Sequence, residues 1–335
     1  MPQAGEQSFL IVRLGSLGDL VHTLPAVAAL RAGFPHARLD WVVEQKWSSL
    51  VELVTVVDNV IPWRRGIFNF LTGVGGLRER KYSCAIDFQG LYKSALLARC
   101  SGAPRRIGFA AAFARESGAS RFYSKRVIPD GRHVAELNLS LAVAGGASRT
   151  VLMAYPLRQP EQSTALRELL DRESLGAYLV VSPGGGWRSK CWPPERYGAL
   201  CADLWRRHSI RAVVNAGPGE EELGRRVIAA AGPAKPVLFS PSLRDLAALL
   251  GRARVVVGAD TGPMQLAAAL GTPVVALFGP TDPARNGPIP KGVVLRNASG
   301  YETTYKRDDS HAPSMLALSV EQVTAAVERA WSDQS

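Results

Sequence analysis

Residues 9–19 read FLIVRLGSLGD, an apolar run that turns through two glycines toward a helix. The run Phe9–Leu14 is rich in β-forming residues and predicts a buried strand. Gly15 and Gly18 permit a tight turn and a close backbone approach to a ligand, and Asp19 stands where the loop enters a helix. The loop lacks both the GxGxxG pattern of dinucleotide-binding folds and the GK[ST] pattern of P-loops. The stretch therefore predicts a strand–loop–helix unit without either fingerprint.

The same alternation continues outward along the chain. In the first half, further strand-like runs lie at Leu39–Val43, Val60–Pro62 and Ala85–Phe88. In the second half they lie at Tyr178–Ser182, Ala212–Asn215, Val255–Gly258 and Val274–Phe278. Helical periodicity separates them, at Leu24–Ala32, Lys93–Ala98, Glu195–Arg207, Glu220–Ala231, Leu243–Leu250 and Gln265–Leu270. Strands that alternate with helices predict α/β domains with parallel sheets.

One segment, Met153–Glu173, interrupts this alternation with two prolines and a charged helical stretch, which is typical of a linker. We therefore expect one doubly wound domain over residues 1–160 and a second over 174–318. The last helix, Val320–Trp331 within residues 319–335, is expected to cross back onto the first domain. Ligands of such sheets bind at the carboxyl ends of the strands, so the predicted site is a cleft between the two domains.

Composition limits the class of protein. The chain has 335 residues, of which 47% are apolar and 21% charged, as in ordinary globular proteins. No apolar run approaches the roughly 20 residues of a spanning helix, and the start has no basic region followed by an apolar one, so we expect a cytoplasmic protein. The four cysteines show neither CxxC pairing nor metal-ligand spacing, which predicts free thiols.

Positive charge is concentrated in the first half. Residues 1–160 carry 20 lysines and arginines against 11 aspartates and glutamates, a balance of +9, whereas residues 161–335 carry 20 against 18, a balance of +2. Such asymmetry indicates an anionic partner on the first half, or a basic solvated surface.

Asp19 is the candidate for acid–base chemistry in the first loop. A carboxylate at a helix start accepts hydrogen bonds from free N–H groups, so it is also a natural helix cap. The two roles agree only in part, because capping lowers the pKa of the carboxylate and weakens it as a base. The spacing alone leaves cap and catalytic base open.

The loop SPGGGWRSKCWPPERY at 182–197 also follows a strand and precedes a helix. Its three glycines expose backbone N–H groups, and Arg188 and Lys190 add positive charge. With the following helix start, they predict a cradle for an anion. A diphosphate leaving group needs such a cradle when no metal is present. A surface loop with incidental charge is the alternative.

Two further loops point to the same kind of ligand. GADTGPMQLAAALGTPVVALFGPTDP at 258–283 contains the turn Asp260–Thr261–Gly262, a helix that starts at Pro263, and a second strand that runs into another turn. AGPGEEE at 216–222 places Glu220 after a strand, where a carboxylate can hold ribose hydroxyls or merely favour a helix start. Three such loops at one sheet edge predict a nucleotide site.

Aromatic residues and cations interleave in the basic half. The stretches are Trp63–Phe70 (WRRGIFNF), Gln89–Lys93 (QGLYK) and Arg105–Phe109 (RRIGF). Nucleic-acid binding, an anionic glycolipid at a membrane surface, and plain amphipathic packing are the three interpretations.

Taken in order, these motifs resemble the bacterial ADP-heptose:lipopolysaccharide heptosyltransferases of glycosyltransferase family 9, and most of all the type that adds the first heptose to the Kdo region of lipid A. The resemblance covers nearly the whole chain. It is carried by the first loop with HTLPA, DWVVE, DFQGLYKSA, RRIGF, the SKCWP loop, AGPGEEE and DTGPMQLAAALGTPVVALFGPTDP.

The resemblance implies a GT-B fold and an inverting transfer without a metal or other cofactor. Asp19 would be the base, and Lys190 would steady the departing diphosphate. The donor, ADP-heptose, would contact Gly185, Gly186, Arg188, Glu220, Asp260, Thr261, Gly262 and Gln265. The acceptor, a Kdo-lipid A type molecule, would contact Ser16, Arg64, Lys93, Arg105 and Arg106. The enzyme would sit peripherally on the anionic cytoplasmic face of the inner membrane, with no nucleic-acid partner.

Two departures from the family pattern concern the donor. The donor turn usually continues with histidine where this chain has Gln265, and the glycine loop usually offers hydroxyl side chains where it has Gly185 and Gly186. They leave open a related transferase with another sugar nucleotide or a later core acceptor. A GT-B-shaped nucleotide-sugar epimerase is the alternative from another class; it would need a pair of acid–base residues around the donor sugar, and no such pair is evident. A basic binding module without catalysis is disfavoured by the retained Asp19 and Lys190.

Overall fold

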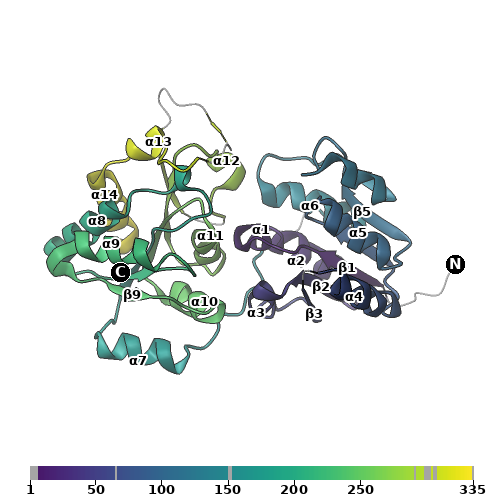
Figure 1. Cartoon of the computed structure of the whole chain (residues 1–335), viewed down its shortest axis with the longest axis horizontal. Helices are drawn as coiled ribbons and strands as arrows, with labels where there is room; N and C mark the ends of the chain where they lie inside the picture. The colour runs from purple at the N-terminus through teal and green to yellow at the C-terminus, as the bar shows by residue number, and fades with distance from the viewer. Residues whose placement is uncertain are drawn as a thin grey trace. The chain divides into compact units, whose positions relative to one another are not determined.

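In the computed structural model the chain forms two compact units, residues 1–158 and residues 159–335 (Figure 1). The structure describes residues 7–64, 66–149, 153–289, 292–297, 303–304 and 308–333, without the side chains of 67–72. Every helix among these residues is too short or too polar to traverse a bilayer. The predicted linker, Met153–Glu173, is divided between the two units: residues up to 158 belong to the first, and the rest, with α7 (Thr164–Arg172) and its buried Leu166, belong to the second.

The first unit is built on a six-stranded sheet with the order β3-β2-β1-β4-β5-β6 (Figure 1). All of its strand pairs are parallel. The chain begins at the centre with β1 and winds outward in both directions, which is the doubly wound arrangement. The strands are β1 (Ser8–Val12), β2 (Arg38–Glu44), β3 (Asn59–Trp63), β4 (Cys84–Asp87), β5 (Arg105–Phe109) and β6 (Lys125–Val127).

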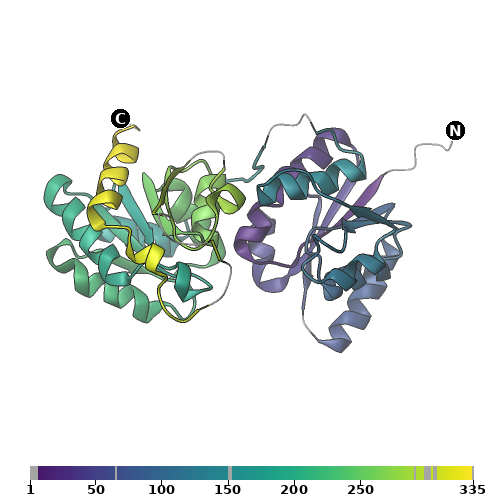
Figure 2. The same ribbon diagram turned by 90° about the horizontal axis from the view of Figure 1, so that it is seen from above.

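Helices cover both faces of this sheet (Figure 2). Leu10 and Val12 of β1 share a buried apolar cluster with Leu97 on one face, where α4 (Ile67–Glu79) and α5 (Tyr92–Cys100) pack. On the other face α2 (Leu24–Gly33) packs against α6 (Val134–Gly145), whose Gly145 lies against Ile86 of β4. The alternation of strand side chains between two helical layers accounts for the near-continuous apolar runs of β1 and β4. The shorter elements are α1 (Leu17–Val21), η1 (Gln45–Trp47), α3 (Ser48–Val51) and η2 (Ser117–Phe122).

The second unit repeats the plan with the strand order β12-β11-β10-β7-β8-β9, again all parallel. Trp192 and Tyr197 lie at the centre of its main apolar cluster, with their rings edge to face at a centroid distance of 5.0 Å. The strands are β7 (Tyr178–Ser182), β8 (Arg211–Asn215), β9 (Val237–Phe239), β10 (Val255–Ala259), β11 (Val274–Phe278) and β12 (Val293–Arg296). The helices are α8 (Pro194–His208), α9 (Glu221–Ala231), α10 (Leu243–Arg252), α11 (Gly262–Ala269), α12 (Pro283–Asn286), α13 (Pro313–Leu316) and α14 (Val320–Ser332).

The last helix, α14, packs on the second unit. Its apolar face, with Val323, Ala326 and Val327 fully buried, joins the same cluster as Tyr197, and α14 contacts α8, β10 and β11. The apolar face of this helix, which was expected to pack on the first domain, therefore packs on the second unit. The apolar stripe of α14 is already used by the sheet that precedes it in the chain.

Parallel strands bring all of their following loops to one edge of each sheet. We call these the first carboxyl edge, formed by the loops after β1 to β6, and the second carboxyl edge, formed by the loops after β7 to β12. The glycine-rich loops of the sequence analysis lie on these two edges.

Candidate active-site clusters

The loop after β1 carries Asp19 to the first carboxyl edge. Gly15 has a φ of +152°, and a Cβ at this position would lie 2.6 Å from Nε1 of Trp47, so the turn requires glycine. Ser16 caps α1, and its backbone N–H and hydroxyl donate to Oδ2 of Asp19 over 3.1 and 3.2 Å. The capping role of Asp19 is thus present in the structure, as a capping box with Ser16.

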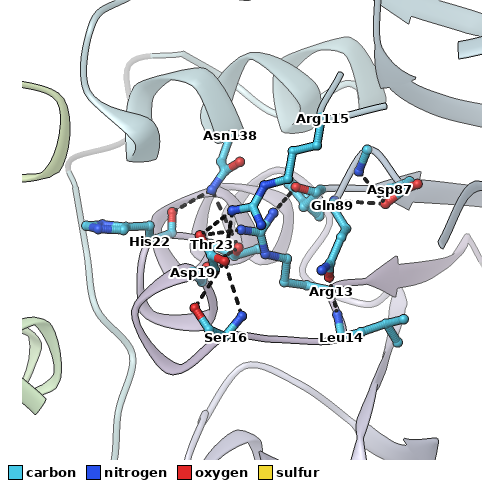
Figure 3. Close-up of polar contacts among 12 residues, drawn as sticks. Arg13, Leu14, Ser16, Asp19, His22, Thr23, Asp87, Gln89, Arg115 and Asn138 are labelled. Atoms are coloured by element: carbon cyan, nitrogen blue, oxygen red, sulfur yellow. Dashed lines mark hydrogen bonds and ion pairs between the residues drawn. The ribbon is translucent and has the colours of Figure 1, made fainter. Parts of the chain in front are cut away.

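Two arginines converge on the Asp19 carboxylate (Figure 3). Nη2 of Arg13 lies 2.7 Å from Oδ1. Nη2 of Arg115, on the loop after β5, lies 2.8 Å from Oδ1 and 2.9 Å from Oδ2. The Arg13 side chain is 3% exposed and also donates through Nη1 to the carbonyl of Phe88, whereas the Arg115 side chain is 51% exposed.

The ion pairs decide the charge of Asp19. Burial by itself raises the pKa of this carboxyl group, but Arg13, Arg115 and the Ser16 N–H together outweigh burial and hold the pKa far below its usual range. Asp19 is therefore ionised at any pH near neutrality. Two guanidinium groups around one carboxylate leave these three side chains with net positive charge. They therefore favour an anionic ligand, and the Asp19 carboxylate beside it can accept a hydrogen bond.

A second buried carboxylate holds the neighbouring loop in place (Figure 3). Asp87, at the end of β4, accepts hydrogen bonds from the N–H of Gln89 at 2.8 Å and from the hydroxyls of Ser94 at 2.8 Å and Tyr123 at 2.7 Å. Gln89 in turn accepts from the N–H of Leu14 through Oε1 at 2.8 Å. The loops after β1 and β4 are thus tied together beneath the candidate site.

Two of the predicted acceptor residues lie on the same edge. Lys93, at the start of α5, places Nζ 3.3 Å from Oε1 of Glu44, the last residue of β2. Arg64 directly follows β3 and donates to the side chain of Gln45. Both cations are therefore on the first carboxyl edge with Ser16 and Asp19.

Arg105 and Arg106 are not on this edge, so the structure does not bring these two predicted acceptor residues together with Asp19. They begin β5 and so lie at the amino end of a parallel strand. Nη2 of Arg105 faces the carbonyls of Ala144 and Gly145 at the end of α6, at 3.4 and 3.5 Å. Arg106 donates to the carbonyls of Phe122 and Ala103. These guanidinium groups satisfy backbone carbonyls at the opposite end of the sheet.

Several aromatic residues of the basic half are core residues. Trp63 and Phe109 are each 8% exposed, and Trp63 packs against the backbone of Gly73 in α4. Arg65 and the side chains of Phe68 and Phe70 lie outside the described residues. Plain amphipathic packing thus accounts for Trp63 and Phe109.

Sequence reasoning missed the partners of Asp19. Arg13 stands within the first loop motif but reads as an ordinary strand residue, and Arg115 follows β5, a strand that the apolar pattern did not reveal. A signal was available for Arg13, because a charged residue at the buried end of an apolar run requires a partner. For Arg115 the sequence offers no comparable signal.

The glycine loop after β7 packs closely against the other loops of the second carboxyl edge. A Cβ on Gly184 would lie 2.1 Å from Oε2 of Glu220, and one on Gly185 would lie 2.8 Å from Sγ of Cys191 and 3.0 Å from Cγ2 of Thr261. A Cβ on Gly186, by contrast, would have no described residue other than its chain neighbours within 4 Å. A hydroxyl side chain therefore has room at position 186 but not at 185.

Lys190 and Asp260, predicted from separate motifs, are brought together. Nζ of Lys190 lies 3.5 Å from Oδ2 of Asp260 and 4.8 Å from the centre of the Trp187 ring. The side-chain amide of Asn286 donates to the same Oδ2 at 3.3 Å. The Lys190 cation is thus held at the helix start that follows Thr261, where backbone N–H groups also attract an anion.

The remaining predicted donor residues lie on the same edge in different environments. Glu220 accepts from the N–H of Gly217 through Oε2 at 2.9 Å, and Thr261 donates to the carbonyl of Ala259 at 3.3 Å. Gly262 begins α11, and Arg188 is exposed in the loop after β7. Gln265 is 3% exposed, and its amide donates to the carbonyl of Asn286. Its side chain therefore supports α12, a contact that the sequence did not predict.

Comparisons with known proteins show which family this chain is similar to. The family model described as glycosyltransferase family 9 (heptosyltransferase) matches residues 74–313. Lipopolysaccharide heptosyltransferase 1 of Pseudomonas aeruginosa is 34% identical over 294 residues, which cover 83% of this chain and 80% of the relative. The protein of the same name from Escherichia coli K12 is 31% identical over 303 residues, covering 86% and 93%.

Among solved structures, the Escherichia coli heptosyltransferase WaaC with ADP matches with a TM-score of 0.74 and 28% identity, covering 97% of this chain and all of that one. The two parallel six-stranded sheets and this similarity confirm the predicted GT-B architecture and the assignment as a glycosyltransferase. The chain belongs to glycosyltransferase family 9, the heptosyltransferases.

Proposed function

We propose that this enzyme transfers heptose from ADP-heptose to the Kdo region of lipid A, with inversion at the anomeric carbon, as a step in lipopolysaccharide inner-core biosynthesis. The proposal is supported by relatives that carry the name lipopolysaccharide heptosyltransferase 1 and by the similarity to a heptosyltransferase solved with ADP. A related nucleotide sugar or a later core acceptor is the alternative to be tested.

In the proposed reaction, an acceptor hydroxyl attacks the anomeric carbon of the donor from the face opposite the diphosphate. The new C–O bond forms as the bond to the diphosphate oxygen breaks, Asp19 takes the hydroxyl proton, and ADP leaves with the bonding electron pair. The hydroxyl becomes strongly acidic only as its oxygen bonds to carbon, so even a weakly basic carboxylate can accept the proton late in the reaction. Lys190 and the start of α11 offset the charge that develops on the diphosphate.

The observation that carries the proposal is the state of Asp19. An ionised carboxylate stands on the first carboxyl edge within a cluster of net positive charge. Ser16, Arg64 and Lys93 extend the polar and basic character of that edge. An acceptor that combines a hydroxyl nucleophile with acidic groups fits this chemistry.

The test is Asp19→Asn, which keeps the size of the side chain and removes its basicity. We expect kcat to fall by roughly 10²–10⁴-fold, the usual contribution of a general base, while ADP-heptose binding measured by calorimetry stays close to wild type. Asp130→Asn, which alters an exposed carboxylate paired with Arg149, is the matched control and should have wild-type turnover. Full turnover by Asp19→Asn would show that Asp19 acts only as a helix cap. A panel of nucleotide sugars in the same assay identifies the donor.

We further propose that the enzyme works in the cytoplasm and docks on the anionic inner face of the membrane through the first carboxyl edge. Three large apolar side chains are exposed in successive loops of this edge: Tyr92 at 51%, Phe113 at 48% and Ile128 at 75%. The cations Lys46, Arg64 and Lys93 lie on the same edge, after β2, β3 and β4. Apolar side chains beside basic ones are typical of surfaces that bind anionic bilayers.

A further inference from the structure

The buried guanidinium of Arg13 has a fixed place between two structural elements (Figure 3). Nη1 donates to the carbonyl of Phe88, just after β4, and Nη2 pairs with Oδ1 of Asp19 at 2.7 Å. The backbone of Arg13 is anchored as well, because its carbonyl accepts from Nε1 of the buried Trp41 at 3.0 Å. A planar fork held at both ends permits little movement of the group that it binds.

The two oxygens of Asp19 have different surroundings. Oδ1 contacts the immobile Arg13, whereas Oδ2 is held by Ser16. Arg115 reaches both oxygens, but its side chain is 51% exposed and so has access to solvent and to a ligand. An acceptor hydroxyl that binds here can therefore take the place of Arg115 at Oδ2, while Oδ1 stays bound to Arg13.

The charged and titratable groups in and around the Asp19 cluster come from five elements. Asp19 is faced by Arg13 after β1, Arg115 after β5 and His22 at the end of α1, while His133 at the start of α6 faces His22 and Asp87 of β4 faces Arg13. Burial lowers the pKa of His22 to about 3, so it is neutral near pH 7. Arginine keeps its charge even when buried, which makes Arg13 the one permanent cation fully enclosed beside Asp19 in the described part of the chain.

We propose that Arg13 is a positioning residue for the transfer reaction: its buried fork fixes Oδ1 of Asp19 and leaves Oδ2 to receive the proton of the acceptor hydroxyl. This inference rests on the proposed role of Asp19 as the base. It assigns different tasks to the two arginines, since the buried one orients and charges the base while the exposed one is available to the acceptor.

If Arg13 positions and charges the base, its removal should change the pH dependence of the reaction, which the loss of a merely structural ion pair would not do. Without Arg13, only the half-exposed Arg115 and the Ser16 N–H would oppose the effect of burial on Asp19, and the pKa of the carboxyl group would rise. A raised pKa protonates the base as the pH falls. The acidic limb of the kcat/KM profile would then move up into the range where the enzyme can be assayed.

The test compares Arg13→Met with Arg13→Lys. For Arg13→Met we expect kcat/KM to fall about tenfold for each pH unit below the new midpoint, whereas the wild type stays flat between about pH 5 and 8. A carbon-13 NMR titration of Asp19 should show the same upward shift of its midpoint. Arg13→Lys keeps a charge but reaches only one of the two partners, so we expect a low midpoint together with a lower kcat at every pH.

Measurements of melting temperature and ADP binding establish that each variant folds. If Arg13→Met does not fold, Arg13→Lys alone provides the test. An unchanged midpoint in Arg13→Met, or wild-type kcat in Arg13→Lys, would overturn the inference while Asp19→Asn remains inactive. If Asp19→Asn is active, the proposed base fails instead. The two failures are therefore distinct.

Discussion

His22 shows how burial dominates the charge state of a side chain next to the Asp19 cluster. The residue is 6% exposed, its ring meets that of His133 edge to face at 5.2 Å, and Asn138 donates to its carbonyl at 2.9 Å. Burial first, and the nearby His133 second, lower the pKa of His22 to about 3 despite the opposing charge of Asp19. The folded enzyme therefore keeps this imidazole neutral.

The pH dependence of stability follows from this shift. Unfolded histidine binds a proton below about pH 6.5, whereas folded His22 does so only near pH 3, so its contribution to stability is present above 6.5 and is lost as the pH falls toward 3. The slope is at most about 1.4 kcal/mol per pH unit. We expect His22→Phe, which cannot titrate, to flatten the free energy of urea unfolding between pH 6 and 4. His36→Phe, at an exposed position, should leave the slope unchanged, and equal slopes in all three proteins would refute the assignment.

At the scale of elements, the strongly buried strands and the edge strand β3 could be predicted, whereas β5, β6, β9 and β12 could not. β1, β2, β4, β7, β8, β10 and β11 are buried almost throughout and appear as apolar runs. β6 has only three residues, with the sequence KRV, and β9 is short and half-buried. Such edge strands are stabilised by backbone hydrogen bonds to the neighbouring strand. Backbone hydrogen bonds leave no apolar pattern in the sequence from which the strand could be predicted.

The same limit explains which site residues could be predicted. Asp19, Lys190 and Asp260 stand in loops that directly follow strongly apolar strands, so their edge was readable from the sequence. Arg105 and Arg106 open β5, and without that strand their position at the opposite end of the sheet was not visible. The contact between Gln265 and Asn286 joins helix α11 to the end of α12, which are separated by β11, and only tertiary packing brings them together.

The loop after β7 supplies a prediction about the leaving group. Lys190 is held by Asp260 and by the Trp187 ring, so its cation is preorganised for a diphosphate. Removing one such charge-assisted contact costs about 1.5–3 kcal/mol. We therefore expect Lys190→Ala to lose roughly 10- to 150-fold in kcat/KM, with a smaller loss for Arg188→Ala in the same loop.

The proposed metal independence is tested in the same assay. Among the described residues, no group of three or more His, Cys, Asp or Glu side chains is placed to hold a metal ion. Wild-type turnover should be unchanged in EDTA, and Mg²⁺ should not rescue Lys190→Ala. Loss of wild-type activity in EDTA with recovery in Mg²⁺ or Mn²⁺ would show that a metal shares the task.

At the scale of the whole molecule, the charge distribution matters more than any single cation. The chain carries a net charge of +11, and its first 160 residues account for +9 of it. Arg105 and Arg106 bind backbone carbonyls at the opposite end of the sheet, whereas Lys46, Arg64, Lys93 and Arg115 are basic residues of the first carboxyl edge. Each basic residue near an anionic leaflet contributes about 1 kcal/mol, an attraction that salt screens.

The apolar side chains of this edge should add a component that salt does not screen. Tyr92, Phe113 and Ile128 follow β4, β5 and β6, which are neighbours in the sheet, so their loops are adjacent. Burying these side chains in the headgroup region gains free energy in proportion to the apolar area removed from water. Electrostatic attraction combined with shallow insertion predicts reversible binding to anionic membranes.

Vesicle co-sedimentation tests this docking surface. We expect binding to vesicles with anionic lipid, weaker binding as salt rises, and little binding to neutral vesicles. Arg64→Glu combined with Lys46→Glu should reduce binding at low salt, whereas Arg78→Glu, at the end of α4, should not.

Phe113→Ser combined with Ile128→Ser should weaken the binding that persists at high salt, with Leu316→Ser, an exposed apolar residue of the second unit, as control. Because none of these substitutions changes a proposed donor-binding residue, ADP affinity should be unchanged in every variant. Equal loss in the control variants, or equal binding to neutral and anionic vesicles, would refute docking through this edge and leave the family assignment intact.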